Sequence, residues 1–300
     1  MILFSFPQYE YYASKLRKIP GWQRGLFSID RYQNQEIFIE VKTAVRGAAC
    51  AILAETAPPD ENLLKLLLLA HTLKKEGAKE IVAIIPYLGY SRHDRKAAGL
   101  DIATQWLGES LRNAGVTEVV TVDVHSEIDA ELFPIPIRSL SPAGVLAKAL
   151  RAHSLEEMTF VAPDAGAVDN CESVRSALGK DIAIARCKKK RSGGRVSSVL
   201  EGSVQKRVVL VDDMLDTGRT LLASLKHLRA AGVRSSIVLV SHGLFSGTGW
   251  RKLWSSGVGH IYCTDTVPHA RRLASKKITV LPAAGILVEY FKHAAYGKGD

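Results

Sequence analysis

Short apolar runs alternate along this chain with longer segments of helical periodicity. The apolar, largely β-branched runs predict buried strands at 48–53, 80–86, 119–124, 158–162, 181–185, 207–211 and 236–240. Helical spacing predicts helices at 60–75, 102–114 and 284–294, the first with Asp60 as its N-cap and Gly77 at its end. Alternation at 36–41 predicts one more strand, preceded by a turn at 31–36. Strands and helices in this order favour right-handed βαβ units and mostly parallel sheets.

Composition narrows the class of protein. The chain has 300 residues, 47% hydrophobic and 23% charged, so it is globular and long enough for one large core or two ordinary ones. Its formal net charge of +10 fits a nucleic-acid partner or a polyphosphate substrate. Four scattered cysteines predict reduced, mostly buried thiols of a cytosolic protein. The sequence predicts neither a signal peptide nor a membrane span.

The most informative stretch is 207–220, an apolar run that ends in two carboxylates and is followed by Asp-Thr-Gly-Arg-Thr and a helical pattern. It predicts a buried parallel strand, a tight loop and a helix start, at the sheet edge where open α/β folds bind ligands. Backbone N–H groups at a helix N-terminus suit a phosphate, and Gly218 lets the backbone take a positive φ or approach a ligand closely. Carboxylates at Asp212 and Asp213 accept hydrogen bonds from two adjacent sugar hydroxyls. An ordinary acidic turn with an N-cap is the alternative.

This stretch resembles the phosphoribosyl-binding loop of type I phosphoribosyltransferases. Its form, Asp-Asp-x-x-Asp-Thr-Gly-x-Thr, is most similar to that of ribose-phosphate pyrophosphokinases. Other segments resemble the same family in the same order. Arg31 to Glu36 is similar to the family's adenine-binding loop, and Pro86 to Arg95 is similar to its ATP-binding segment, with His93 in place of the usual Gln.

Two further strand ends carry residues that the resemblance connects to metal. His125 follows the strand at 119–124, where the family has a His that lines the magnesium–ATP site, and contact partly through water is expected. Asp164, in Pro163-Asp-Ala-Gly-Ala167, matches the metal-binding position of the family's Pro-Asp-x-Gly-Gly loop. Here Ala167 replaces the second Gly and Asp169 adds negative charge. Both changes are expected to affect the affinity for phosphate.

The basic stretch 186–195 is a flexible loop or a nucleic-acid patch on composition alone. It has no interleaved aromatic residues for stacking on bases. By resemblance it occupies the place of the family's mobile catalytic loop. Lys189 and Arg191 fit the family's Lys-x-Arg spacing, and Lys188 with Lys190 is the alternative register.

The resemblance implies an α/β protein of two tandem type I phosphoribosyltransferase domains, each with a parallel-rich central sheet flanked by helices. The expected boundaries are 1–141 for the ATP side and 142–300 for the ribose 5-phosphate side. The implied reaction transfers the diphosphoryl group of ATP to the 1-hydroxyl of ribose 5-phosphate, giving 5-phosphoribosyl 1-diphosphate and AMP, with Mg²⁺ as cofactor. The implied residues are Lys189 and Arg191 for catalysis; Tyr32, Asn34, Glu36, Arg92, His93 and Asp94 for ATP; Asp212, Asp213, Asp216, Thr217, Gly218, Arg219 and Thr220 for ribose 5-phosphate; and His125 and Asp164 for metal.

The resemblance also implies a cytoplasmic protein that associates with itself, from a dimer up to a hexamer, and binds neither nucleic acid nor membrane. Two other functions remain open at this stage. One is a phosphoribosyltransferase, which consumes the diphosphate; the ATP-type segments argue against it. The other is a non-catalytic regulatory homologue of the synthetase, which the changes at Ala167 and Asp169 keep open.

Overall fold

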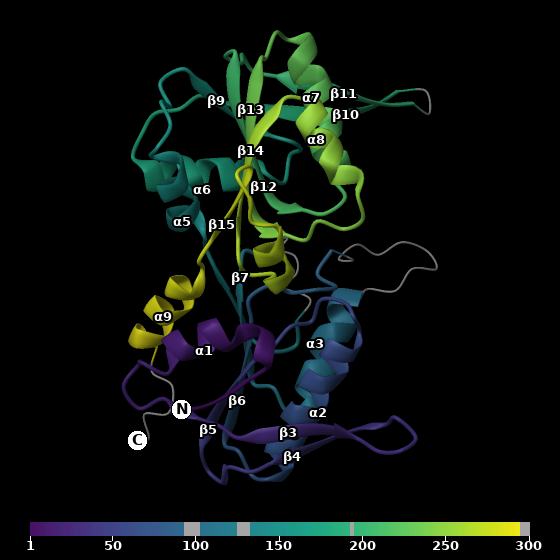
Figure 1. Ribbon diagram of the computed structural model, residues 1–300, viewed down its shortest axis with the longest axis vertical. Coiled ribbons are helices and arrows are strands. Elements are labelled where there is room, and N and C mark those ends of the chain that lie inside the picture. Colours follow the sequence, from purple (N-terminus) through teal and green to yellow (C-terminus); the bar gives the residue numbers. More distant parts are fainter. Residues whose placement is uncertain (93–102, 125–132, 193–194, 295–300) are drawn as a thin grey trace. The chain divides into compact units, whose positions relative to one another are not determined.

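The structure is a computed structural model, and it describes residues 1–92, 103–124, 133–192 and 195–294 (Figure 1). Within this part, only the backbone is described at 189–192 and 195–198. The chain divides into two compact units. Unit 1 is Met1–Leu140 together with Ala284–Asp300, and unit 2 is Ser141–Ala283.

Unit 1 contains a six-stranded sheet in the order β2-β1-β5-β6-β7-β8, and all of its pairings are parallel. An antiparallel hairpin of β3 and β4 forms a separate two-stranded sheet. The strands are β1 (Ile2–Ser5), β2 (Gln23–Arg24), β3 (Phe27–Arg31), β4 (Ile37–Val41), β5 (Ala49–Leu53), β6 (Glu80–Ile85), β7 (Glu118–Val122) and β8 (Ile137–Leu140). The helices are α1 (Glu10–Leu16), α2 (Glu61–Lys75), α3 (Ala103–Ala114) and α9 (Ala284–His293), with a 3₁₀ turn at Pro7–Tyr9.

Helix α2 lies over this sheet with one apolar face. Leu66, Leu69 and Leu73 recur at helical spacing, and none of the three side chains is exposed. The predicted helix is confirmed almost to the residue, and Asp60 is its N-cap as predicted, although the Asp60 side chain makes no capping hydrogen bond. The Asp60 carboxylate instead accepts a hydrogen bond from the Tyr90 hydroxyl, and this contact raises the pKa of Tyr90 to about 12.

Unit 2 contains a seven-stranded sheet in the order β11-β10-β9-β12-β13-β14-β15, parallel except for the antiparallel pair β10–β11. The strands are β9 (Met158–Ala162), β10 (Ile184–Ser192), β11 (Arg195–Glu201), β12 (Arg207–Leu215), β13 (Ser235–Gly243), β14 (Val258–Thr264) and β15 (Ile278–Leu281). The helices are α5 (Ala143–Leu150), α6 (Val168–Leu178), α7 (Arg219–Ala230) and α8 (Lys252–Ser255), with 3₁₀ turns at Gly249–Arg251 and Pro268–Leu273.

Successive residues of β12 bury opposite faces of this sheet. Val208 and Leu210 pack in a core cluster with Leu225 of α7, whereas Val209 and Val211 pack in a second cluster with helices α5 and α6. A strand covered on both faces needs apolar residues at every position, which explains the unbroken run at 208–211. The α/β class and parallel-rich sheets predicted from the sequence are confirmed.

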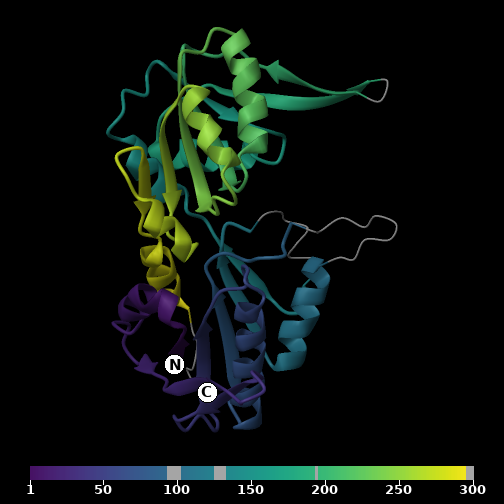
Figure 2. The same ribbon diagram turned by 45° about the vertical axis from the view of Figure 1, so that its right-hand side comes forward.

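Two strands are longer than predicted. Strand β12 continues to Leu215, because Met214 and Leu215 still pair with His242 and Gly243 of β13. Strand β10 runs to Ser192 rather than ending at 185, so the loop predicted over 186–192 is wrong. Its lysines lie in a ladder with β11, and both views show the two strands extending as an arm beyond the rest of the sheet (Figures 1 and 2).

The last helix does not belong to the domain that the sequence assigned to 142–300. Helix α9 is part of unit 1, where it packs on α1. Leu287 and Phe291 are buried there, and the rings of Phe291 and Trp22 meet edge to face with centroids 5.0 Å apart. The chain therefore leaves unit 1 near Leu140 and returns to it at Ala284.

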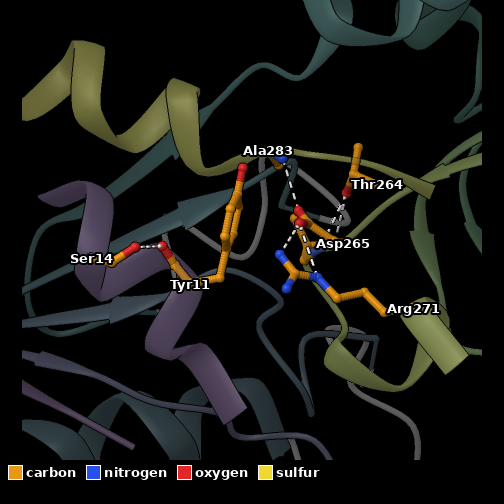
Figure 3. Close-up of polar contacts among 7 residues, drawn as sticks. Tyr11, Ser14, Thr264, Asp265, Arg271 and Ala283 are labelled. Carbon is orange, nitrogen blue, oxygen red and sulfur yellow. Dashed lines mark hydrogen bonds and ion pairs between the residues drawn. The ribbon is translucent and has the colours of Figure 1, made fainter. Parts of the chain in front are cut away.

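The point where the chain leaves unit 2 is held by a buried carboxylate (Figure 3). Asp265, after β14, is 3% exposed. It accepts hydrogen bonds from the Arg271 guanidinium and, over 2.8 Å, from the main-chain N–H of Ala283. Nearby, the Thr264 hydroxyl donates to the Ser241 carbonyl. These contacts fix the ends of β13, β14 and β15 to one another.

Candidate active site

Two carboxylates lie side by side in the last part of β12, one strand position apart. Asp212 and Asp213 are both partly buried, and the Asp213 N–H donates to Asp212 Oδ1 over 3.1 Å. Asp164 follows the neighbouring strand β9, and its charge reaches Asp212. Burial, together with the charges of Asp213 and Asp164, raises the pKa of Asp212. The fold therefore brings Asp164 to the adjacent pair Asp212 and Asp213, which lies far from it in sequence, at the carboxyl edge of the sheet.

The next segment of chain forms a turn that opens onto the N-terminus of α7. Gly218 takes the left-handed conformation (φ 79°) as the residue before the helix, and its carbonyl accepts the Leu222 N–H. Helix α7 has no acidic residue in its first turn, and Arg219 and Thr220 are exposed. Its first N–H groups have no acceptor within the helix, so the helix start suits an anion such as phosphate.

The segment around Gly249 and Trp250 packs closely against this turn. A Cβ atom added to Gly218 would lie 2.9 Å from the Cα of Trp250, and one added to Gly249 would lie 3.1 Å from the Thr217 carbonyl. The turn thus has no room for a side chain at 218. The positive φ that the sequence predicted for Gly218 is confirmed. The role of Trp250 was missed, since no motif spacing singles it out.

The loop after β9 is also compact. The Gly166 N–H donates to Asp164 Oδ1 over 3.1 Å, which turns the carboxylate back over the loop. Ala167 is 2% exposed and belongs to the core cluster beneath α6. The methyl group of Ala167 therefore packs in the core cluster, and the effect of Ala167 on phosphate affinity or on the class of acceptor stays a prediction. Asp169, in the first turn of α6, is exposed.

The donor set fits Mg²⁺. Carboxylate oxygens are ligands that this ion prefers, and it is commonly held by one or two carboxylates with the remaining positions filled by water and phosphate. Asp164 and Asp212 supply such oxygens, and burial together with the charges of Asp213 and Asp164 raises the pKa of Asp212. Among the described residues, no group of three or more His, Cys, Asp or Glu forms a complete cage. His125 lies outside the described residues.

In unit 1, the predicted turn at 31–36 is confirmed as the connection of the β3–β4 hairpin. The Gln35 N–H donates to the Tyr32 carbonyl, and the Asn34 side chain accepts the Glu36 N–H over 3.2 Å. Tyr32 is 57% exposed, and its ring lies 4.6 Å from that of Phe38. An exposed ring on a tight turn offers a surface for stacking.

The second segment predicted to bind ATP leaves the end of β6. Gly89 packs so closely that an added Cβ would lie 2.7 Å from the Thr56 carbonyl, and its N–H donates to the Thr56 hydroxyl. Arg92 is exposed after this turn. His93 and Asp94 lie outside the described residues.

The basic arm carries Lys189 and Arg191 on β10, at positions that pair with Ser198 and Val196 of β11. These two positions alternate with 188 and 190 along the strand, so each candidate register occupies one face. Lys188 and Arg186 form ion pairs with Glu201, at 3.4 and 2.8 Å. Lys188, from the alternative pair of candidates, thus already forms an ion pair with a residue of β11.

The four cysteines are free and buried, as the sequence predicted. Among the described residues, no helix is long and apolar enough to cross a membrane.

Comparisons with known proteins agree with this arrangement. A family model for the N-terminal domain of ribose phosphate pyrophosphokinase matches residues 1–115, and a model for the phosphoribosyl transferase domain matches residues 130–252. The fold and the site thus define a protein with two tandem domains of the phosphoribosyltransferase class.

Curated relatives cover almost the whole chain. The ribose-phosphate pyrophosphokinase of Wolinella succinogenes is 32% identical over 99% of this chain and 96% of its own length, and that of Chromobacterium violaceum is 34% identical over 88% and 83%. The crystal structure of phosphoribosylpyrophosphate synthetase from Mycobacterium smegmatis superposes with a TM-score of 0.85 at 27% identity, covering 97% of both chains. The chain belongs to the ribose-phosphate pyrophosphokinase family.

Proposed function

We propose that this protein is a ribose-phosphate diphosphokinase. It transfers the diphosphoryl group of ATP to the 1-hydroxyl of ribose 5-phosphate, giving 5-phosphoribosyl 1-diphosphate and AMP. The observation that carries the proposal is the joint arrangement in unit 2 of paired carboxylates on β12 and a left-handed turn at the start of α7. The family membership of both units supports the same activity.

Ribose 5-phosphate is assigned to unit 2. Asp212 and Asp213 accept hydrogen bonds from the adjacent ribose hydroxyls. The 5-phosphate takes the turn Asp216–Thr220, where the N–H groups and the positive end of the α7 dipole face it. The hydroxyls of Thr217 and Thr220 add donors, and Arg219 adds positive charge.

ATP is assigned to unit 1. Tyr32 supplies a face for the adenine ring, and Asn34 and Glu36 supply polar groups that distinguish the polar edge of adenine from the edges of other bases. Arg92 binds the phosphate chain, since a guanidinium makes paired contacts to phosphate oxygens, and His93 and Asp94 are further ATP-binding residues.

Mg²⁺ is the proposed cofactor, with Asp164 and His125 as the residues that hold it. When bound, it neutralises charge on the diphosphoryl group. The Asp164 carboxylate accepts a hydrogen bond from the Gly166 N–H of its own small-residue loop.

Catalysis by this site is positioning and charge stabilisation. The 1-hydroxyl oxygen forms a bond to the β-phosphorus, the bond from that phosphorus to the α–β bridging oxygen breaks, AMP leaves, and the hydroxyl proton is released. Lys189 and Arg191 stabilise the charge on the migrating group. No covalent intermediate is required.

We also propose that the protein is cytoplasmic, associates with itself from a dimer up to a hexamer, and binds neither nucleic acid nor membrane. Sedimentation of the purified protein with and without Mg²⁺ and ATP tests the assembly.

The test of function is ³¹P NMR of protein, Mg²⁺, ATP and ribose 5-phosphate. We expect AMP and a sugar-linked diphosphate to appear together, and only when ribose 5-phosphate is present. Unchanged ATP beside an active control synthetase would instead favour a regulatory homologue. Diphosphate formed from 5-phosphoribosyl 1-diphosphate and a free base would indicate a phosphoribosyltransferase.

A further inference from the structure

Ser224 is a buried residue of α7 that no substrate-binding motif includes. It is 2% exposed. Its Oγ lies 3.3 Å from the carbonyl of Pro163 and 3.2 Å from that of Thr220. Pro163 is the residue before Asp164, and Thr220 closes the turn assigned to the sugar phosphate. One hydroxyl therefore lies between the two loops that border the site in unit 2.

A third segment reaches the same hydroxyl. Cys187 on β10 is buried, and its thiol lies within hydrogen-bonding range of Ser224. Burial raises the pKa of the Cys187 thiol, and the hydrogen bond with Ser224 lowers it. Cys187 lies two residues before Lys189, so Ser224 also contacts the strand that carries the basic residues.

The two carbonyls compete for the single hydroxyl proton. Donation to Thr220 stays within α7 and links nothing outside the helix, a common local contact of helical serines. Donation to Pro163 connects α7 to the β9–α6 loop. Pro163 is buried, and a buried carbonyl without a partner is costly, which favours the connection between the segments.

We propose that Ser224 is a positioning residue that sets the spacing between the Asp164 loop and the Asp216–Thr220 turn. The inference rests on the proposed function, in which the turn holds the 5-phosphate and Asp164 holds the metal. A sugar phosphate bound at the turn must present its 1-hydroxyl to the metal-bound diphosphate. Misplacement of one loop relative to the other therefore weakens the binding of ribose 5-phosphate.

The test compares Ser224→Ala with Ser236→Ala. Ser236 is also a buried serine of unit 2, but it lies at the amino end of β13, away from the loops. Steady-state rates are measured with ribose 5-phosphate, ATP and Mg²⁺ varied in turn, together with thermal unfolding. For Ser224→Ala we expect a rise of about two- to tenfold in the KM for ribose 5-phosphate and in the Mg²⁺ concentration at half-maximal rate, the range of one lost hydrogen bond. The KM for ATP should stay at the wild-type value, and Ser236→Ala should change none of the three.

An equal loss of thermal stability in both variants, with all three kinetic constants of Ser224→Ala at wild-type values, would show that Ser224 only stabilises the helix. If Ser224→Ala does not fold, Ser224→Cys decides the question, because a thiol of similar size is a weaker donor. A raised KM for ribose 5-phosphate in Ser224→Cys supports the inference, and an unchanged KM contradicts it. A wild-type protein that forms no 5-phosphoribosyl 1-diphosphate contradicts the proposed function itself, whereas an active wild type with unaltered Ser224 variants contradicts only this inference.

Discussion

Asp212 lies in β12 beside Asp213 and within the field of Asp164, and burial with these two charges raises its pKa. The same carboxylate is assigned to the ribose hydroxyls, where it has to be ionised to accept from both. A buried, charged carboxylate that serves substrate binding reduces the folding stability of the protein when no substrate is bound.

Replacing Asp212 with Asn is therefore expected to raise the melting temperature while it weakens ribose 5-phosphate far more than ATP. A carboxyl whose folded pKa lies above its unfolded pKa costs stability at pH values above both, and this cost disappears as pH falls through the folded pKa. The gain in melting temperature should thus be largest above the folded pKa of Asp212 and shrink as the pH is lowered through it, measured by calorimetry over a pH series in the presence of a chelator. Asp169→Asn, at an exposed carboxylate, is the control. A gain that is independent of pH would contradict the assignment.

Gly218 offers a second test at this scale. Gly218→Ala should raise the KM for ribose 5-phosphate at least about tenfold and destabilise the protein by about 1–3 kcal/mol, because φ is 79° and the new Cβ would meet Trp250. Gly232→Ala is a matched control: its φ is 89°, but nothing lies within 4 Å of the added Cβ. Equal kinetic effects of the two substitutions would show that backbone strain alone is responsible. Enzyme kinetics and urea unfolding supply both measurements.

Among the elements, the β10–β11 arm shows how tertiary pairing overrides a local pattern. A run of lysines and arginines predicts a solvated loop, since it has no apolar alternation. The chain nevertheless forms a strand through Ser192, because each residue from Arg186 onward pairs with one of β11. Local propensity carries little information about strand pairing, which depends on the partner strand and on burial.

The arm predicts which basic residue acts on the diphosphate. Lys189→Ala should lower kcat by about 100-fold or more, the usual loss when a donor to developing charge is removed. Lys188→Ala should lower kcat by less than about threefold, because Lys188 already pairs with Glu201 at the surface. Neither change should alter ribose 5-phosphate binding at equilibrium. Pre-steady-state measurement of AMP formation tests both variants. A larger loss in Lys188→Ala would reverse the register.

The two compact units of the molecule do not follow one another along the chain. Both ends of the chain belong to unit 1, and unit 2 is an insertion between Leu140 and Ala284. The last helix was assigned to the second domain because its sequence follows the second domain directly. Its apolar face, however, packs on α1 through Leu287 and Phe291.

Phe291→Ala should therefore destabilise unit 1 and leave unit 2 unaffected. Loss of a buried aromatic ring costs about 3–5 kcal/mol. Hydrogen exchange should accelerate in α1 and β1, while β12 and β13 keep their wild-type protection. The exposed neighbour variant Lys292→Ala should change neither group of amides. Faster exchange in β12 or β13 of Phe291→Ala would show that α9 supports unit 2.

The sequence by itself determined the α/β class, most strand and helix positions, and the candidate residues at the ends of β6, β9 and β12. These features follow from local periodicity and from motifs that are continuous in the chain. Only the tertiary structure decided that Ala167 faces the core, that the basic stretch is a paired arm, that Ser224 lies between two loops, and that α9 returns to unit 1. The arm depends on the pairing of two consecutive strands, and the other three features depend on contacts between segments far apart in sequence; local periodicity encodes neither kind of contact.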